Sequence, residues 1–264
     1  MVTKQDIQNL LIQFGIKSTD TVLVHSSMRS TGGMEGGCDT VIDAFCEYLS
    51  DGLFLVPSHT WDRVNADHPF DVRNTMPCTG ALCTVAVGRP EGVRSLHPTH
   101  SVVAFGKRAA EFTDGELRAT SPGFIGGCWN RLYEEYAKIL LLGVGLNRNT
   151  FIHAVDEMMD LPDRLMPPAP IKVIDGEGVE HILPEYRRHA KSRHEYFVNY
   201  KKALEDLGAI TYGQLGDALV YCCDAKLCAD IIMHIWKKTD HDLNEKFEEI
   251  PEEYYSDFRS TDCV

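Results

Sequence analysis

Short apolar runs alternate with a helical pattern near the start of the sequence, and this order limits the fold more than any other feature. The run TVLV at 21–24 follows Asp20 and precedes a polar loop, which is typical of a buried strand. Residues 39–49 place apolar side chains at helical spacing, and LFLV at 53–56 predicts a second buried strand. A strand, a helix and a strand in this order indicate an α/β unit with a right-handed crossover.

The spacing of apolar residues predicts further helices and strands along the chain. We predict an amphipathic helix over 1–15, and then helices over 80–87, 107–113, 129–136 and 150–159, with strands over 102–105 and 138–142. The four prolines of 162–170 break regular structure and predict a crossing between regions. The segments 171–174 and 179–183 flank the turn residues DGEG and predict a hairpin.

The C-terminal part of the chain reads as helical over 191–207 and 214–238. We therefore expect an α/β body over 1–165, a smaller and mainly helical sub-domain over 166–240, and a peripheral acidic tail over 241–264. A chain of 264 residues suits this arrangement as one large domain with a sub-domain.

Composition and charge exclude several classes of protein. The formal net charge of −13 opposes binding to a nucleic-acid backbone, whereas it suits either a cationic substrate or simply a solubilising surface. No apolar run approaches the roughly 20 residues that span a bilayer, and the N-terminal residues lack the order of a signal peptide. We therefore expect no membrane partner and a cytoplasmic location. The nine cysteines include no CxxC pair, which predicts reduced thiols rather than a cysteine-based zinc site.

Two polar segments adjoin predicted strands. HSSMRSTGG (25–33) follows the first strand, and its small residues allow a ligand to approach the backbone; it lacks the GxxxxGK[ST] pattern of a P-loop. SLHPTHSV (95–102) leads into another strand, and by itself it leaves two alternatives, metal ligation by His97 and His100 or a polar loop. Pro98 pushes the residue before it into an extended conformation, so we favour the loop.

Two further segments follow the buried strand KILLL (138–142). GVGLNRNT (143–150) contains GxG without the third glycine of a dinucleotide loop, although a strand–loop–helix junction is a place where ligands bind in open sheets. In HAVDE, which starts at His153, Asp156 or Glu157 lies one helical turn away if Thr150 caps the helix. A carboxylate there would suit a general base, but a surface His–carboxylate pair has the same spacing. The HExxH pattern of zinc hydrolases is absent.

Taken together, these segments resemble the aminoglycoside 3-N-acetyltransferase family, also called the antibiotic N-acetyltransferases. The matching text is LVHSSMRSTGGMEGG (23–37), RSLHPTHSVVAFG (94–106), SPGFIGGCWNRLYE (121–134) and LLLGVGLNRNTFIHAVDE (140–157). Several separated motifs in the right order are more specific than any one of them, and the resemblance extends from about residue 2 to about residue 228.

The resemblance implies a fold distinct from the GNAT acetyltransferases, with a central mixed sheet flanked by helices and a smaller sub-domain. It also implies acetyl-CoA as the co-substrate, bound between loops, without a metal. The residues that it places against the pantetheine and the thioester are Ser26, Ser27, Met28, Thr99, His100, Ser101 and Val102. His153 is the implied catalytic base, and the family's glutamate three residues later is Asp156 here, so either Asp156 or Glu157 orients His153.

The implied reaction is direct attack by the 3-amino group of a 2-deoxystreptamine aminoglycoside on the thioester, with a loop at Ser26 or Thr99 stabilising the oxyanion. The alternatives are a family member that acetylates a non-antibiotic amine, a CoA-binding protein without turnover, an acyl-cysteine enzyme and a zinc hydrolase that uses His97, His100 and His153. The thiols nearest to glycine-rich or loop text are Cys78, Cys83 and Cys128. The segment after the second strand contains Trp61, Asp62, Arg63 and Asp67. These residues are expected either to contact the acceptor or to form a solvated loop, and the sequence favours neither.

Overall fold

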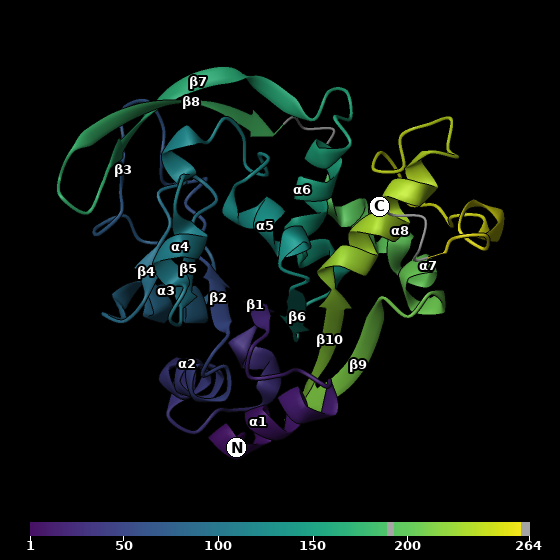
Figure 1. Ribbon diagram of the computed structural model, residues 1–264, viewed down its shortest axis with the longest axis horizontal. Coiled ribbons are helices and arrows are strands. Elements are labelled where there is room, and N and C mark those ends of the chain that lie inside the picture. Colours follow the sequence, from purple (N-terminus) through teal and green to yellow (C-terminus); the bar gives the residue numbers. More distant parts are fainter. Residues whose placement is uncertain (189–192, 260–264) are drawn as a thin grey trace.

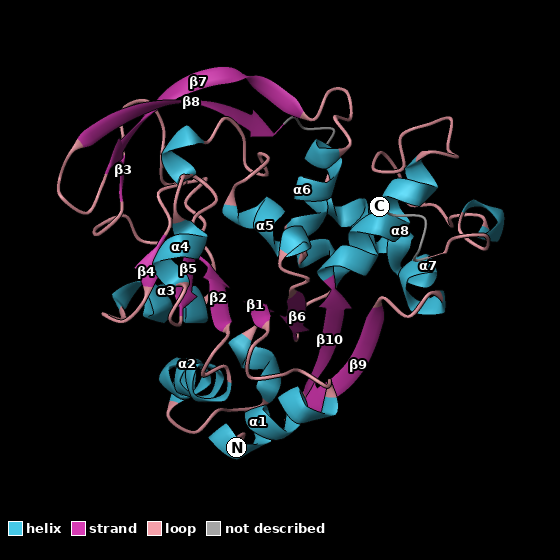
Figure 2. Cartoon of the chain, in the orientation of Figure 1, coloured by secondary structure: helices cyan, strands magenta, loops and turns pink. Residues whose placement is uncertain are grey.

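The computed structural model describes residues 1–188 and 193–259, with the side chains of 185–188 left aside. Its centre is a seven-stranded mixed sheet in the order β4-β5-β2-β1-β6-β10-β9, with helices on both sides (Figures 1 and 2). The seven strands are β1 (Thr21–Ser26), β2 (Leu53–Pro57), β4 (Val93–Arg94), β5 (Val102–Phe105), β6 (Lys138–Leu142), β9 (Ile210–Leu215) and β10 (Ala218–Asp224). β1 pairs in parallel with β2 and β6, and the outer pairs are antiparallel.

The helices form two layers because side chains along the central strands alternate between two cores. In β1, Leu23 belongs to one core while Val22 and Val24 belong to the other. The layer around Val22 and Val24 consists of α1 (Lys4–Gln13), α2 (Gly37–Tyr48) and α3 (Ala81–Gly88). The layer around Leu23 consists of α4 (Ala109–Thr113), α5 (Cys128–Glu134), α6 (Phe151–Met158), α7 (Lys201–Asp206) and α8 (Ala225–Trp236). The strand and helix predictions up to residue 159 are thus confirmed.

A second sheet has three strands in the order β3-β7-β8 and arches over one end of the molecule (Figure 1). It comprises β3 (Phe70–Asp71), β7 (Leu165–Ile174) and β8 (Glu180–Arg188). The predicted hairpin is confirmed, but the prediction that 162–170 lacks regular structure is wrong, since most of these residues belong to β7. Pro168 and Pro170 are two residues apart, so their nitrogens share one edge of β7, and β3 pairs with β7 only from Val173 onward.

The helix predicted over 214–238 is wrong in its first half. Residues 210–215 and 218–224 form β9 and β10, and β10 pairs antiparallel with β6 of the central sheet; only α8 is helical. Because β7, β8, β9 and β10 all fall within 166–240, this segment is not mainly helical. The predicted helix over 191–207 is a 3-10 helix (His194–Tyr200) followed by α7, and residues 191 and 192 lie outside the described residues.

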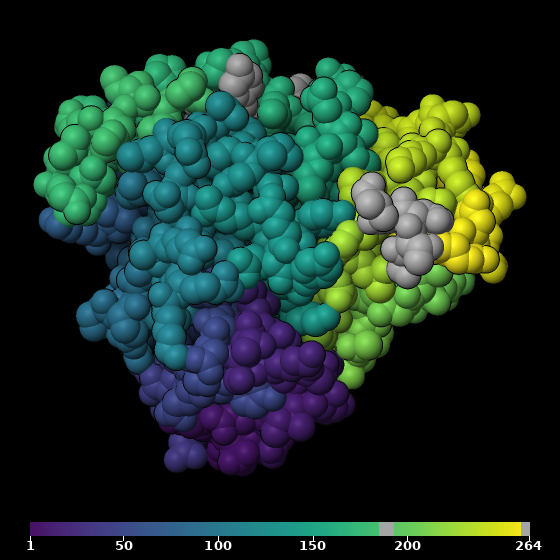
Figure 3. All heavy atoms as spheres, in the orientation of Figure 1, coloured from purple at the N-terminus to yellow at the C-terminus, as the bar shows by residue number. Residues whose placement is uncertain are grey.

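The acidic C-terminal segment is not peripheral. Leu243, Ile250, Tyr255 and Phe258 are buried in the same core as α5, α6 and α8. Figure 3 shows this segment, in yellow, packed against the green residues that precede it. No helix within the described residues is long and apolar enough to cross a membrane.

Candidate active site

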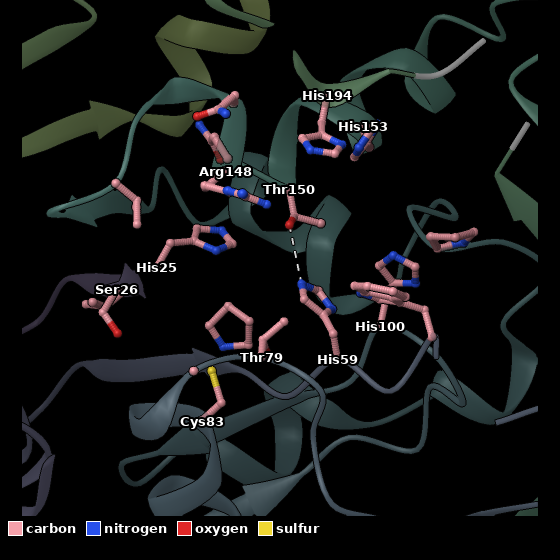
Figure 4. Close-up of a pocket in the computed structure, with 18 of the residues that line it drawn as sticks. His25, Ser26, His59, Thr79, Cys83, His100, Arg148, Thr150, His153 and His194 are labelled. Atoms are coloured by element: carbon pink, nitrogen blue, oxygen red, sulfur yellow. Dashed lines mark hydrogen bonds between the residues drawn. The ribbon is translucent and has the colours of Figure 1, made fainter. Parts of the chain in front are cut away.

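A cavity of about 570 Å³ opens where β1, β2 and β6 end (Figure 4). Its wall includes Val24–Ser26 at the end of β1, the loop after β2, and Val144 and residues 147–150 after β6. Ligands in open α/β sheets bind at the carboxyl ends of parallel strands, and this cavity has that position. The loop after β6 begins with Gly143, which lies against the loop after β1. A Cβ at Gly143 would lie 2.5 Å from the Cβ of Ser30, so only glycine allows the two loops to come this close.

His153 projects from the first turn of α6 into this cavity and is 7% exposed. Its Nδ1 lies 3.9 Å from Oδ2 of Asp156, one turn along the helix. The ring packs edge-to-face against Phe197, with 4.6 Å between centroids. Thr150 precedes the helix as predicted, but its hydroxyl makes no capping bond and instead lies 3.3 Å from Nε2 of His59. The imidazole is therefore held between a carboxylate and an aromatic ring.

Asp156 is fully buried behind His153 and does not line the cavity. Its carboxylate lies 3.6 Å from Nε of Arg164, and Nδ2 of Asn244 donates to it at 3.4 Å. Arg164 in turn makes two hydrogen bonds to Asp242. The carboxylate beside His153 is thus anchored by the C-terminal segment.

Glu157 has a different surrounding. It accepts hydrogen bonds from the Ser121 hydroxyl and from the Gly123 amide, the latter at 2.9 Å. These bonds hold the loop that carries Pro122, which lines the main cavity, while Ser121 and Glu157 line a second cavity of about 340 Å³. The contact between Asp156 and His153, together with these bonds, makes Asp156 the better candidate for orienting His153.

Four of the residues predicted to act in catalysis or to bind acetyl-CoA meet in the main cavity: Ser26, Thr99, His100 and His153. Ser27 instead accepts a hydrogen bond from the hydroxyl of Ser30, and Met28 packs against the core. Ser101 is buried against Ser58, and Val102 belongs to the core below the cavity. The side chains of Ser27, Met28, Ser101 and Val102 support the loops rather than line the cavity.

Several cavity residues escaped the sequence analysis, above all three imidazoles and two residues of the loop after β6. They are His25, His59, Arg148, Asn149 and His194. The positions of His25 and Asn149 beside predicted strand ends were a usable signal, since ligands gather there. His59 and His194 lie in irregular or 3-10 segments without a motif.

The indole of Trp129 contacts three histidines that line the cavity. The rings of His25 and His59 both stack on it, with centroid distances of 6.0 and 5.4 Å, and its Nε1 donates to the carbonyl of His100. Burial lowers the pKa of His25 to about 3, so this ring is neutral at physiological pH. Burial, followed by the charge of Arg148, also lowers the pKa of His194.

The next candidates are His97, a possible metal site and the predicted acceptor contacts. Nδ1 of His97 accepts from the amides of Thr99 and His100, and Nε2 donates to the carbonyl of Ser121. Among the side chains that the structure describes, those of 1–184 and 193–259, no three His, Cys, Asp or Glu are arranged to hold a metal ion. Of the predicted acceptor contacts, Trp61 lines the cavity, whereas Asp62 and Arg63 pair with each other at 3.3 Å and Asp67 is exposed.

Burial dominates the environment of the three candidate cysteine nucleophiles. It raises the pKa of Cys78 to about 11, and it also raises the pKa of Cys83 and of Cys128. A nucleophilic cysteine needs a lowered pKa, because the thiolate is the reactive form. These surroundings oppose an acyl-cysteine intermediate.

The cavity lies where open α/β sheets bind their ligands, and comparisons with known proteins identify the chain as an acyltransferase and give its family. Residues 23–237 match the family model described as aminoglycoside 3-N-acetyltransferase, so the chain belongs to this family. Among curated relatives, the aminoglycoside N(3')-acetyltransferase-like protein YokD of Bacillus subtilis is 28% identical, over 82% of this chain and 85% of that protein. Aminoglycoside N(3)-acetyltransferase III of a Salmonella species is 26% identical, over 86% and 88%.

Solved structures of the family share the fold. The YokD crystal structure has a TM-score of 0.75 at 24% identity, over 87% of this chain and 91% of that chain. AAC-IIIb in a binary complex with CoASH has a TM-score of 0.73 at 22% identity, over 86% and 93%. A mutant of AAC(3)-IVa in complex with a gentamicin has a TM-score of 0.73 at 24% identity, over 86% and 85%.

Proposed function

We propose that this chain transfers the acetyl group of acetyl-CoA to a primary amine, with His153 as the general base. The observation that carries the proposal is the position of His153, on the wall of a cavity at the ends of the parallel strands, with Asp156 behind it. Family membership and the CoA complex of AAC-IIIb support acetyl-CoA as the donor.

The amine arrives mostly as an ammonium ion and must lose a proton before it can attack. His153 lines the cavity and its Nδ1 faces Asp156, so its imidazole is placed to accept that proton as a general base. A separation of 3.9 Å is too long for a hydrogen bond, so Asp156 acts through its charge and stabilises the imidazolium that forms. The nitrogen lone pair forms the new C–N bond, the C–S bond breaks, and CoA leaves as the thiolate.

The loops around the cavity are candidates for stabilising the negative charge that develops on the thioester oxygen. Ser26 and Thr99 line the same cavity as His153, so their loops can offer amide and hydroxyl donors to a ligand bound there. Donors held in place before the reaction need no reorganisation when charge develops.

We further propose an aminoglycoside as the acceptor, acetylated at the 3-amino group of its 2-deoxystreptamine ring. The names of the curated relatives and the gentamicin complex of AAC(3)-IVa support this acceptor class. The net charge of −13 favours the capture of a polycation. Acetylation would remove one positive charge and one hydrogen-bond donor from the antibiotic.

The test measures release of the CoA thiol from acetyl-CoA in the presence of gentamicin, sisomicin or kanamycin. His153→Ala should lower kcat/KM by about 10²- to 10⁴-fold, the usual contribution of a general base. His181→Ala is the matched control, because His181 pairs with Asp175 on the hairpin and does not line the cavity.

The possible outcomes separate the acceptor from the reaction. Thiol release with other amines but with none of these antibiotics would keep the acetyl transfer and reject the acceptor. CoA binding without release for any amine would indicate a binding protein. Full activity of His153→Ala would reject His153 as the base.

A further inference from the structure

A cluster of three charged side chains lies behind His153 and consists of Asp156, Arg164 and Asp242. The side chains of Asp156 and Arg164 are 0% and 3% exposed, and that of Asp242 is 23% exposed. Two carboxylates share one guanidinium, so the cluster lacks one positive charge. An uncompensated negative charge in a buried place favours the protonation of a base beside it.

The guanidinium of Arg164 is directed at Asp242 rather than at Asp156. Its Nη1 and Nη2 donate to the two carboxylate oxygens of Asp242 at 2.6 and 2.9 Å. Its Nε lies 3.6 Å from Oδ2 of Asp156, which is an ion-pair distance but too long for a hydrogen bond. Asp242 therefore receives the stronger bonds of Arg164, and the charge of Asp156 is balanced less completely beside the imidazole 3.9 Å away.

Neutral groups hold the cluster in place without adding charge to it. Asn244 donates to Oδ1 of Asp156 at 3.4 Å and accepts from the hydroxyl of Tyr200 at 3.0 Å, while its backbone amide donates to Asp242 at 2.8 Å. Burial raises the pKa of Tyr200, so the phenol stays neutral. Burial opposes the charge of Arg164, but the hydrogen bond to Asp242 and the charge of Asp156 raise its pKa, and the guanidinium stays charged.

We infer that Arg164 and Asp242 are positioning residues that set the strength of His153 as a base, and that they act through Asp156. Asp242 holds the guanidinium away from Asp156, and the imidazole supplies the missing positive charge when it takes the proton of the ammonium ion. This inference rests on the proposed function, since it takes His153 as the base. Asp242 lies beyond residue 237, where the match to the family model ends.

The other titratable groups around His153 lie on the cavity wall or on α6. Figure 4 shows His194 beside His153. Glu157, the next carboxylate of α6, is bonded to the loop at Ser121. The titratable side chains that share the cavity wall with His153 are His25, His59, Cys83, His100, Arg148 and His194. None of these groups is changed in the variants below, so their charges form the same background in each of them.

The test follows the titration of the His153 ring by NMR in the protein without substrates. The resonance is identified by its loss in His153→Gln. In Asp242→Asn the cluster loses a negative charge, and the guanidinium is then balanced by Asp156 alone. An imidazolium beside this neutral pair is less stable, so the pKa of His153 should fall by about one pH unit, at the low end of the effect of a neighbouring charge.

Two further variants separate charge from structure. Arg164→Gln removes the positive charge and should raise the pKa of His153, which keeps the inference testable if Asp242→Asn does not fold. The double variant Arg164→Gln/Asp242→Asn has the same net charge as the unmodified cluster. It should return the pKa of His153 to about its original value, a rescue that a merely supporting role of Asp242 in the fold does not predict.

Asp240→Asn is the matched control. Asp240 lies two residues before Asp242 in the same segment, but its side chain is 95% exposed and pairs with His241. This variant removes the same charge at the surface, where solvent and salt screen it, and it should leave the pKa of His153 unchanged.

The pH profile of kcat/KM provides a second readout. In Asp242→Asn its acidic limb should extend to lower pH together with the pKa of His153, and its plateau should fall a few-fold, because a weaker base accepts the proton less readily. An unchanged pKa of His153 in both Asp242→Asn and Arg164→Gln would overturn the inference, as would an equal fall in Asp242→Asn and in the double variant. If the unmodified protein releases no thiol with any amine, the proposed function fails, and the NMR titration still shows whether Arg164 and Asp242 control the proton affinity of His153.

Discussion

The imidazoles of His25 and His153 line one cavity, yet their surroundings suit them to different tasks. His153 faces Asp156 across 3.9 Å, so a proton taken up by its ring meets a negative charge. His25 lies against the indole of Trp129, and burial alone lowers its pKa to about 3. A base that weak does not accept a proton from an ammonium near neutral pH, which leaves His25 to hydrogen bonding.

The low pKa of His25 also predicts how stability depends on pH. Below pH 6.5 the unfolded chain protonates this histidine, while the folded chain excludes the proton down to about pH 3. Stability therefore falls as the pH drops, and between pH 7 and pH 5 this group accounts for about 2 kcal/mol of the loss. His25→Phe should remove that part of the slope, as measured by urea unfolding at several pH values.

A second histidine provides the control for this pH dependence. Hydrogen bonds to Asp240 and Glu248 raise the pKa of His241, so its contribution is present at low pH and is lost as the pH rises. His241→Gln should change the slope in the opposite sense. Identical slopes for His25→Phe and the unmodified protein would show that His25 is protonated in the folded state.

At the scale of single residues, the sequence predicted the cavity in part. Four residues from the recognised sequence motifs line the cavity, namely Ser26, Thr99, His100 and His153. The spacing of Asp156 and Glu157 after His153 is nearly the same, so only the contacts of α6 with its neighbours separate them. Asp156 faces Arg164 and Asn244, whereas Glu157 bonds to the loop at Ser121, and no local pattern encodes either set of partners.

Among the elements, the loop of residues 121–124 packs closely against α6. A Cβ added to Gly123 would lie 2.6 Å from the Cα of Ala154, and Glu157 bonds the loop from the same helix. Pro122 of this loop lines the main cavity. The position of the cavity wall therefore depends on how tightly the loop packs against the helix that carries His153.

Gly123→Ala tests this dependence. The added methyl must push the loop away from α6, and overpacking of this kind typically costs about 1–3 kcal/mol. We expect a lower Tm and a higher KM for acetyl-CoA, measured by thermal unfolding and by steady-state kinetics. Gly176→Ala is the control, since its added Cβ meets nothing within 4 Å. Unchanged Tm and KM in Gly123→Ala would show that the loop is not held by this contact.

Prediction of elements from the sequence succeeded where a side-chain period was clear and failed where partners decided the structure. The period along 21–56 and 138–158 predicts β1, α2, β2, β6 and α6 closely. Residues 214–224 are compatible with a helix in isolation, but pairing of β10 with β6 along the central sheet makes them strands. A proline usually breaks a strand that has partners on both sides. Pro168 and Pro170 are tolerated because they lie in the part of β7 that pairs with β8 but not with β3.

For the whole molecule, the C-terminal segment completes the core beside the active-site helix. Its apolar side chains join the core that contains α6, and Asn244 bonds both to Asp156 and to the hydroxyl of Tyr200. Charge composition predicted a peripheral tail because acidic residues dominate the segment. The buried residues between those charges, together with the ion pair of Asp242 with Arg164, determine its position.

Leu243→Ala measures how much this segment contributes to the fold. Leu243 is 1% exposed in the main core, so its truncation should lower the free energy of unfolding by about 2–5 kcal/mol, as measured by guanidinium unfolding. Phe247 lies in the same segment but is 67% exposed, so Phe247→Ala should change stability far less. Equal, small effects of the two variants would mean that the segment is a surface tail after all. A large difference would mean that the environment of Asp156, and through it that of His153, depends on residues far along the chain, beyond the end of α8.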